Sequence, residues 1–61
     1  MEGFFVIYSA NEAATQGRGF WSENRQSWVD LDDATVWEGE PHFVPPSLGN
    51  DAAIVPFPEG Y

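Results

Sequence analysis

The sequence contains no cysteine among its 61 residues. Neither a disulfide nor a thiolate-bound metal can therefore staple the chain, although domains of this size often depend on such a staple. The aromatic content is high instead, with three Trp, two Tyr and five Phe. Because each large aromatic ring can bury roughly 150–250 Å², we expect residues 1–61 to form a single folded domain with an aromatic core.

The clearest predicted strand is Phe4–Ser9, a short apolar run that follows Gly3. Every residue from Phe4 to Tyr8 is aromatic or a β-branched aliphatic residue, so both faces of this strand are apolar. A strand with two apolar faces usually lies in the centre of its sheet or is covered on both sides. We therefore expect this segment to be the central strand.

A β-hairpin is predicted after the first connection. Phe20–Ser22 and Ser27–Val29 are strand-like runs that flank a polar four-residue loop. In that register Trp21 lies opposite Trp28, and a cross-strand aromatic pair of this kind contributes roughly 0.2–1 kcal/mol. The sequence thus predicts a hairpin held by paired tryptophans.

The predicted helix is Asp30–Glu38. Asp30 suits the N-cap position, the acids that follow suit the positive end of the helix dipole, and Gly39 is a natural stop. The connection Asn11–Gly19 is expected to hold at most one helical turn.

The last third of the chain, from Pro41 onwards, contains all five prolines. His42–Val44 and Ala52–Phe57 are predicted as short strands limited by proline, and Leu48–Asp51 has the composition of a turn. Together these elements predict an α+β fold: a small antiparallel sheet of three to four strands with one short helix packed on one face.

The charged residues are almost all acidic. Ten Asp and Glu stand against two Arg and no Lys, for a net charge of −8. Direct binding to DNA or RNA is disfavoured, because phosphate binding needs cationic side chains. The longest apolar run, Phe4–Tyr8, is far below the roughly 20 residues that span a bilayer, and Met1-Glu2 offers no basic start for a secretory signal. We expect a cytoplasmic protein.

Catalytic and metal-binding motifs are not evident. His42 is the only histidine, and no nucleophile-elbow pattern surrounds any serine. Asp30–Asp33 faintly resembles a calcium loop but lacks the mid-loop Gly and terminal Glu, while Gly17–Gly19 lacks the Lys and Ser/Thr of a phosphate loop. We therefore expect no enzyme activity, no catalytic residue, no metal and no cofactor.

The acids are densest between Asp30 and Glu40, where five fall in eleven positions with no cation among them. A solvated surface that aids solubility would explain them, but a one-signed field also steers association with basic partners. Two of the three tryptophans are expected in the core, with Trp37 partly exposed as a possible interface anchor. The predicted partner-binding residues are Asp30, Asp32, Asp33, Trp37, Glu38 and Glu40.

The segment Gly19–Thr35 is predicted to be a hairpin with paired tryptophans followed by Asp-Ala-Thr. It resembles a sequence motif of many small phage and prophage proteins. Together with the size, acidity and lack of cysteine, it resembles the small anti-CRISPR proteins of phages and mobile elements, in particular inhibitors of type I-C interference. The resemblance implies a monomer in the bacterial host cytoplasm that binds the type I CRISPR surveillance complex (Cascade) and blocks target DNA binding by charge mimicry or steric occlusion, without catalysis.

Two other classes remain open. A small phage structural or accessory protein would assemble through an aromatic surface or a strand edge, and its acidity would serve solubility only. A small hydrolase is disfavoured because the sequence offers no evident nucleophile–base pair.

Overall fold

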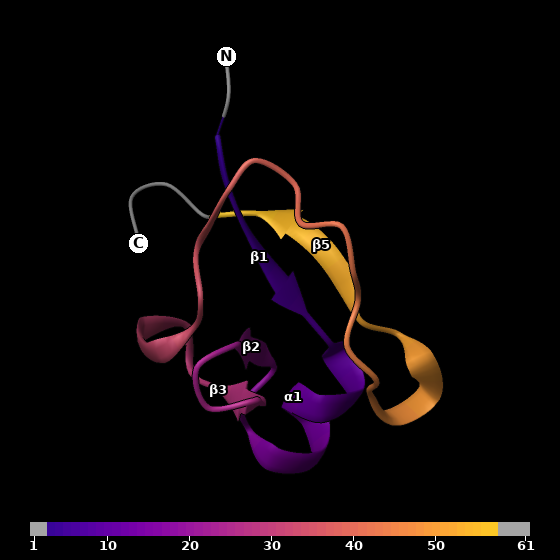
Figure 1. Cartoon of the computed structure of the whole chain (residues 1–61). Coiled ribbons are helices and arrows are strands. Elements are labelled where there is room, and N and C mark those ends of the chain that lie inside the picture. The colour runs from indigo at the N-terminus through magenta and orange to yellow at the C-terminus, as the bar shows by residue number, and fades with distance from the viewer. Residues whose placement is uncertain (1–2, 58–61) are drawn as a thin grey trace.

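The computed structural model describes residues 3–57 and confirms a small α+β fold (Figure 1). The sheet is antiparallel and has five strands, one more than the upper limit of the prediction. No helix in the described range is long and apolar enough to cross a membrane. In chain order the elements are β1 (Phe4–Tyr8), α1 (Ala10–Gln16), β2 (Phe20–Ser22), β3 (Ser27–Val29), the 3₁₀ turn η1 (Leu31–Asp33), β4 (Trp37–Glu38), the 3₁₀ turn η2 (Leu48–Asn50) and β5 (Ala53–Pro56).

Strand β1 is the centre of the sheet, as its two apolar faces predict. Tyr8 pairs with both Phe20 of β2 and Ala53 of β5, so β2 and β5 lie on opposite edges of β1. The other end of β1 is paired in the same way, by β4 on one edge and β5 on the other. Between these ends, Val6 and Ile7 are completely buried. All three neighbouring strands therefore converge on one five-residue segment.

The β2–β3 hairpin has the predicted register. Trp21 pairs with Trp28, and their rings meet edge to face with centroids 5.2 Å apart. Gln26 completes the four-residue loop with a positive φ of 52°. The outer strand β3 contributes Trp28 and Val29 to the core.

The α-helix lies at Ala10–Gln16, not at the predicted Asp30–Glu38, and Figure 1 shows it at the end of β1. The Ser9 hydroxyl accepts a hydrogen bond from the Glu12 N–H at 3.1 Å, which caps the first turn. Gly17 ends the helix in the left-handed region, at φ 75°, and donates its N–H to the Ala13 carbonyl at 2.8 Å. The spacing of Ser9 and Glu12 is the Ser-x-x-Glu signature of a helix start.

The predicted helix Asp30–Glu38 is wrong for a physical reason. The Asp30 side chain makes no capping bond, and the helical geometry ends after the single turn η1. The chain then extends, since the Thr35 N–H bonds to the Trp21 carbonyl at 3.0 Å and β4 pairs with β1. β-branched and aromatic residues favour such a pleated, half-buried position, and here pairing with β1 overrides the helix signal.

The C-terminal third agrees with the prediction in two of three elements. Strand β5 confirms the segment Ala52–Phe57, and η2 confirms the turn at Leu48–Asp51, where Gly49 has a φ of 70°. His42–Val44 is not a strand. After β4, Gly39 takes a φ of 87°, a conformation that ends strand geometry there.

Gly19 provides a test of how closely α1 approaches the sheet. A Cβ at this position would lie 2.7 Å from the Ser9 carbonyl oxygen and 2.7 Å from the Ala13 Cβ. Gly19→Ala should therefore lower the free energy of unfolding by about 1–3 kcal/mol, as overpacking does. Urea unfolding followed by tryptophan fluorescence measures the change. Gly3→Ala is the matched control, because a Cβ there meets nothing within 4 Å, and equal effects of the two variants would refute the packing argument.

Candidate functional site

The carboxylates of the described residues fall into two groups. Glu12 and Asp51 are tied into hydrogen bonds near the start of α1. The other six are exposed and all belong to one stretch of chain, which we call the acidic segment (residues 23–40). Its exposed carboxylates are Glu23, Asp30, Asp32, Asp33, Glu38 and Glu40.

Asp51 joins the turn after η2 to the N-terminus of α1. Its carboxylate accepts hydrogen bonds from the Ser9 hydroxyl at 2.5 Å, from the Asn11 N–H at 2.9 Å and from the Ser47 hydroxyl at 3.2 Å. The bond from Ser9 is the main cause that holds the pKa of Asp51 below its ordinary value of 3.8, against the opposing cost of partial desolvation. The ionised form of Asp51 is thus the form that holds this junction together.

Glu12 serves the same junction from the helix side. Its side chain is 6% exposed, and it accepts hydrogen bonds from the Leu48 N–H at 3.0 Å and from the Gln16 amide. A buried carboxylate is tolerated only when its oxygens are satisfied in this way. Glu12 and Asp51 are therefore structural acids, whereas the acidic segment supplies charge to the surface.

The structure does not place the six predicted partner-binding residues on one helix. Asp30, Asp32 and Asp33 lie at η1, while Glu38 lies in β4, opposite Phe4. Glu40 follows the turn at Gly39, and Trp37 is a half-buried strand residue. What these positions share is continuity along the acidic segment, not a common helical face.

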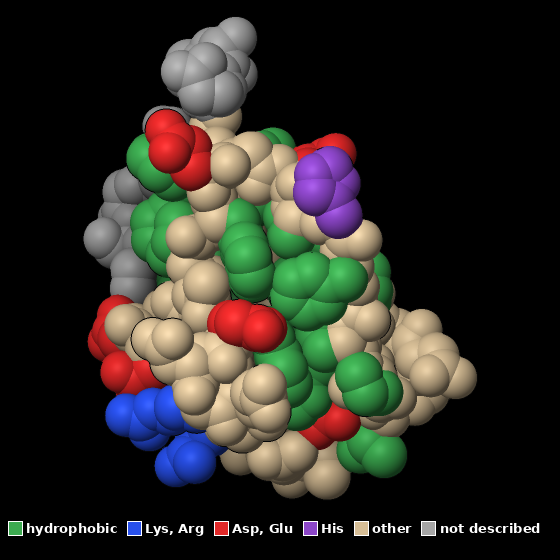
Figure 2. Space-filling model, viewed as in Figure 1, with side chains coloured by type: hydrophobic (Ala, Val, Ile, Leu, Met, Phe, Trp, Pro, Cys, Tyr) green, Lys and Arg blue, Asp and Glu red, His purple; other side chains and the backbone are tan. Residues whose placement is uncertain are grey.

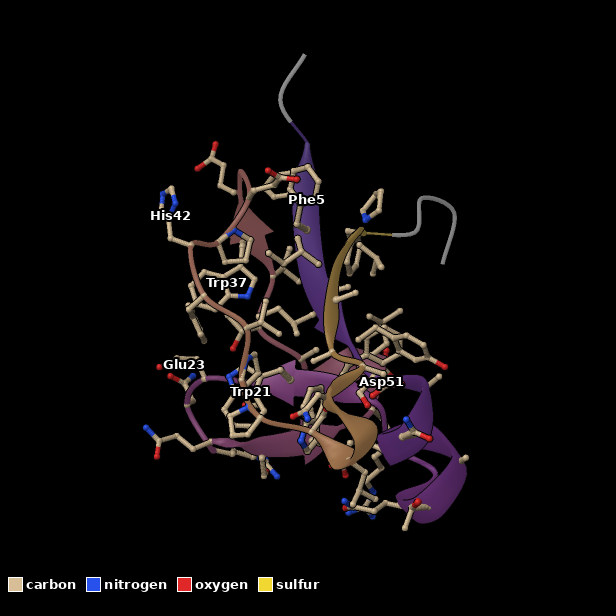
Figure 3. The ribbon with its side chains drawn as sticks, turned by 90° about the vertical axis from the view of Figure 1, so that its right-hand side faces the viewer. Phe5, Trp21, Glu23, Trp37, His42 and Asp51 are labelled. Atoms are coloured by element: carbon tan, nitrogen blue, oxygen red, sulfur yellow. The ribbon has the colours of Figure 1, made fainter. Side chains whose placement is uncertain are left out.

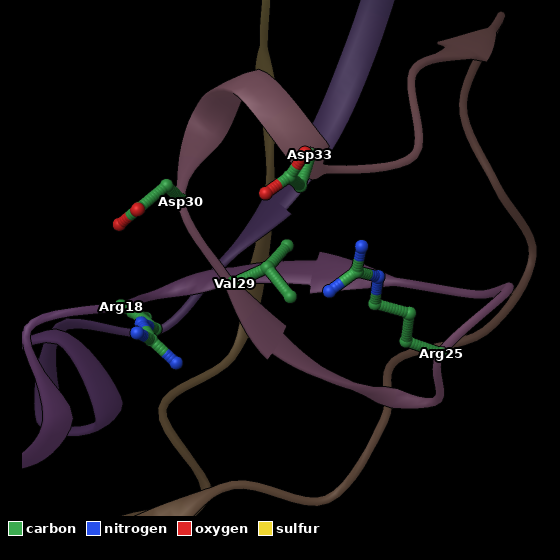
Figure 4. A pocket seen from close by; sticks show the side chains of 5 residues that line it. All are labelled: Arg18, Arg25, Val29, Asp30 and Asp33. Carbon is green, nitrogen blue, oxygen red and sulfur yellow. The ribbon is translucent and has the colours of Figure 1, made fainter.

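Both arginines lie next to part of the acidic segment. Arg18 and Arg25 line a surface cavity of about 110 Å³ together with Val29, Asp30 and Asp33 (Figure 4). They are the only Lys or Arg residues of the sequence. The two cations consequently offset part of the negative field near Asp30 and Asp33, and Figure 2 shows blue side chains next to red ones at the surface.

Exposed apolar side chains lie close to the acidic segment in sequence. Val36, Phe43 and Val44 are 43%, 41% and 52% exposed, and the Phe43 ring meets Trp37 edge to face at 5.4 Å. We use the name aromatic surface for these four residues, Val36, Trp37, Phe43 and Val44, together with the half-buried Trp21. One tryptophan, Trp28 at 8% exposure, belongs fully to the core, rather than the expected two.

Glu23 is a site residue that the sequence reasoning missed. Its carboxylate accepts a hydrogen bond from Trp21 Nε1 at 3.0 Å, and its N–H donates to the Thr35 hydroxyl at 2.8 Å. Figure 3 places it with Trp21 and Trp37 on the side of the molecule that faces the viewer in Figure 2, where hydrophobic side chains border a carboxylate on one side. The available signal was that Glu23 follows β2 directly, two positions after Trp21.

Other chemistry has little support in the described residues. His42 is exposed, and no three His, Asp or Glu side chains within residues 3–57 gather closely enough to hold a metal ion. The indole N–H of Trp37 is buried without a hydrogen-bond partner in the same part of the chain. Beside the acidic segment, the Trp21 indole N–H donates a hydrogen bond to the Glu23 carboxylate.

Comparison of the chain with family models, with curated proteins and with solved structures gives no match in any of the three.

The Asp51 junction predicts a pH-dependent loss of stability. Because the pKa of Asp51 is lowered in the folded protein, its contribution is fully present above the unfolded value of about 3.8 and is lost as the pH falls through the lower folded value. Asp51→Asn should therefore lower Tm at pH 7, and the difference from the wild type should shrink below pH 3.8. Thermal unfolding by circular dichroism at several pH values measures this.

Asp32→Asn is the control for that experiment, because it removes the same charge from an exposed position. In a chain with a net charge of −8, loss of one exposed acid should leave Tm unchanged or raise it slightly by relieving repulsion. A fall in Tm that is equal for the two variants would contradict a specific role for Asp51.

Proposed function

We propose that this protein is a non-enzymatic inhibitor that binds the basic, nucleic-acid-binding surface of a partner protein. The observation that carries the proposal is the placement of every exposed carboxylate of the described residues in the acidic segment, close in sequence to most of the aromatic surface. Acids elsewhere in that range, Glu12 and Asp51, are held in internal hydrogen bonds. Within residues 3–57, the negative charge exposed to a partner therefore comes from one part of the chain.

A protein channel that binds DNA is lined with Lys and Arg that contact phosphates. Carboxylates held on a folded surface offer the same guanidinium groups charge-assisted hydrogen bonds. Exposed aromatic side chains add apolar contact area, and Trp is enriched among the residues that contribute most to binding. The molecule spans 33 × 24 × 19 Å, which is enough for an interface of roughly 800 Å² per partner.

The two arginines separate the proposed contact residues into two groups: acids that lie beside an arginine and acids that do not. Asp30 and Asp33 share a cavity with Arg18 and Arg25, so their charge is partly balanced within the protein. The main charged contacts that we propose are Glu23, Asp32, Glu38 and Glu40, with Trp37 in the aromatic surface.

For the partner, we propose the type I CRISPR surveillance complex, because of the resemblance of the sequence to small phage anti-CRISPR proteins. In that role the protein acts in the cytoplasm of a bacterial host as a monomer, and it blocks target DNA binding by occupying the basic region of the complex. Stoichiometric blocking is sufficient, so neither a cofactor nor a catalytic residue takes part.

A structural or accessory phage protein is the second candidate, favoured by the exposure of Val36, Phe43 and Val44. Such a surface can assemble copies of the chain, with the acids serving solubility. Light scattering on the purified protein separates the two. A defined homo-oligomer that does not affect DNA binding by Cascade supports assembly, and a monomer that blocks it supports inhibition.

The charge contacts are tested with Glu38→Gln/Glu40→Gln. In an electrophoretic assay of target DNA binding by purified type I-C Cascade, this variant should inhibit about threefold to tenfold less than the wild type at 150 mM salt, with a weaker dependence on salt. The control Ala14→Lys/Thr15→Lys changes the net charge equally at exposed positions of α1 and should inhibit like the wild type.

Two results would count against this proposal. Full inhibition by the folded Glu38→Gln/Glu40→Gln variant would remove these acids from the interface. An equal loss in both variants would show that net charge alone, rather than the acidic segment, governs inhibition.

A further inference from the structure

We propose that Glu23 and the indole ring of Trp21 bind one arginine side chain of the partner protein, at the edge of the aromatic surface. This inference rests on the proposed function for the nature of the partner, and it adds a specific contact to a surface that is otherwise defined by its charge.

Glu23 is held in place before any partner arrives. Its N–H donates to the Thr35 hydroxyl at 2.8 Å, and one carboxylate oxygen accepts from Trp21 Nε1 at 3.0 Å. The Thr35 N–H in turn donates to the Trp21 carbonyl at 3.0 Å, which fixes the segment between η1 and β4 to β2. No hydrogen bond to the second carboxylate oxygen occurs within residues 3–57. An ordered carboxylate with unused acceptor capacity is thus presented at the surface.

Aromatic side chains lie on one side of this carboxylate. Trp21 is half-buried and packs on Trp28 with 5.2 Å between ring centroids, so its indole cannot turn away from Glu23 without breaking that contact. Figure 3 shows Trp21 and Glu23 on the same side as Trp37, and Figure 2 shows a carboxylate bordered by hydrophobic side chains on that face. A partner that covers this face removes water from the carboxylate, which then requires a cation as its neighbour.

Arginine suits this site better than lysine. Its planar guanidinium is weakly hydrated, stacks on an aromatic ring and can bond to a carboxylate at the same time, whereas the lysine ammonium is a strongly hydrated point charge. The chain has no lysine, and both of its arginines line the cavity at Asp30 and Asp33. The cation must therefore come from another molecule, and a protein with a net charge of −8 attracts basic ones.

The test uses a defined probe, the acetylated and amidated peptide (Gly-Arg)₄, with (Gly-Lys)₄ for comparison, at 150 mM salt. Titration of the ¹⁵N-labelled protein is followed by NMR at the three indole N–H signals. The arginine peptide should shift the Trp21 signal most, because that N–H bonds to Glu23. The lysine peptide, which has the same charge, should bind several-fold more weakly.

Glu23→Gln should weaken binding of the arginine peptide by about fivefold to tenfold, since it removes the charged acceptor. Thr15→Lys, which changes the net charge by the same amount on an exposed turn of α1, should weaken it less than twofold. Trp21→Phe is a second variant that keeps an aromatic ring but loses the N–H that orients Glu23, and it should also weaken binding. Backbone amide spectra establish that each variant is folded.

Three results would overturn the site: equal binding of the two peptides, equal weakening by Glu23→Gln and Thr15→Lys, or a largest shift at an indole other than Trp21. The Cascade assay separates this inference from the proposed function. If the wild type binds the arginine peptide selectively but leaves DNA binding by Cascade unchanged, the arginine site stands and the proposed function fails. If the wild type blocks Cascade but shows no preference for arginine, the function stands and the site fails.

Discussion

The pairing of β1 along both of its edges is the interaction on which the rest of the structure depends. Three strands from different parts of the chain, β2, β4 and β5, meet on these five residues. Val6 and Ile7, at its middle, are the most deeply buried apolar side chains of residues 3–57. In a chain without cysteine, this convergence takes the place of a covalent staple. The acidic segment is positioned by it as well, since β4 is held to the sheet through its pairing with Phe4 and Phe5.

The sequence correctly predicts the elements that are determined by residues close together in the chain. The central strand follows from the apolar run Phe4–Tyr8, and the hairpin follows from two strand-like runs around a polar loop, which also sets the pairing of Trp21 with Trp28. The helix was misplaced because two candidate starts compete. Asp30 resembles a cap in the sequence but bonds to nothing as a cap, whereas Ser9 does cap a helix. Pairing of Trp37 with Phe5, 32 positions earlier in the numbering, decides the outcome, and no local pattern contains that contact.

The candidate site shows the same limit. Acid density drew attention to residues 30–40, whose acids are exposed, yet it could not separate surface charges from structural ones. Asp51 bonds to Ser9 across 42 positions, and Glu12 bonds to Leu48 across 36. Likewise, Arg18 and Arg25 line the same cavity as Asp30 and Asp33. Part of the negative charge that has no neighbouring cation in the sequence is therefore offset in the folded protein. Such long-range pairings arise only when the sheet assembles, and they decide which acids remain available.

The division of the acids has a consequence for how salt acts on this protein. Repulsion among the exposed carboxylates opposes the compact state, so screening by salt stabilises the free protein. The same screening weakens attraction between the acidic segment and a basic partner. The junction of Asp51 and Glu12 is less sensitive, because its short hydrogen bonds are screened less than separated surface charges. Under the proposed function, stability and partner binding therefore depend on salt with opposite signs: low salt strengthens the proposed binding but makes the free protein less stable.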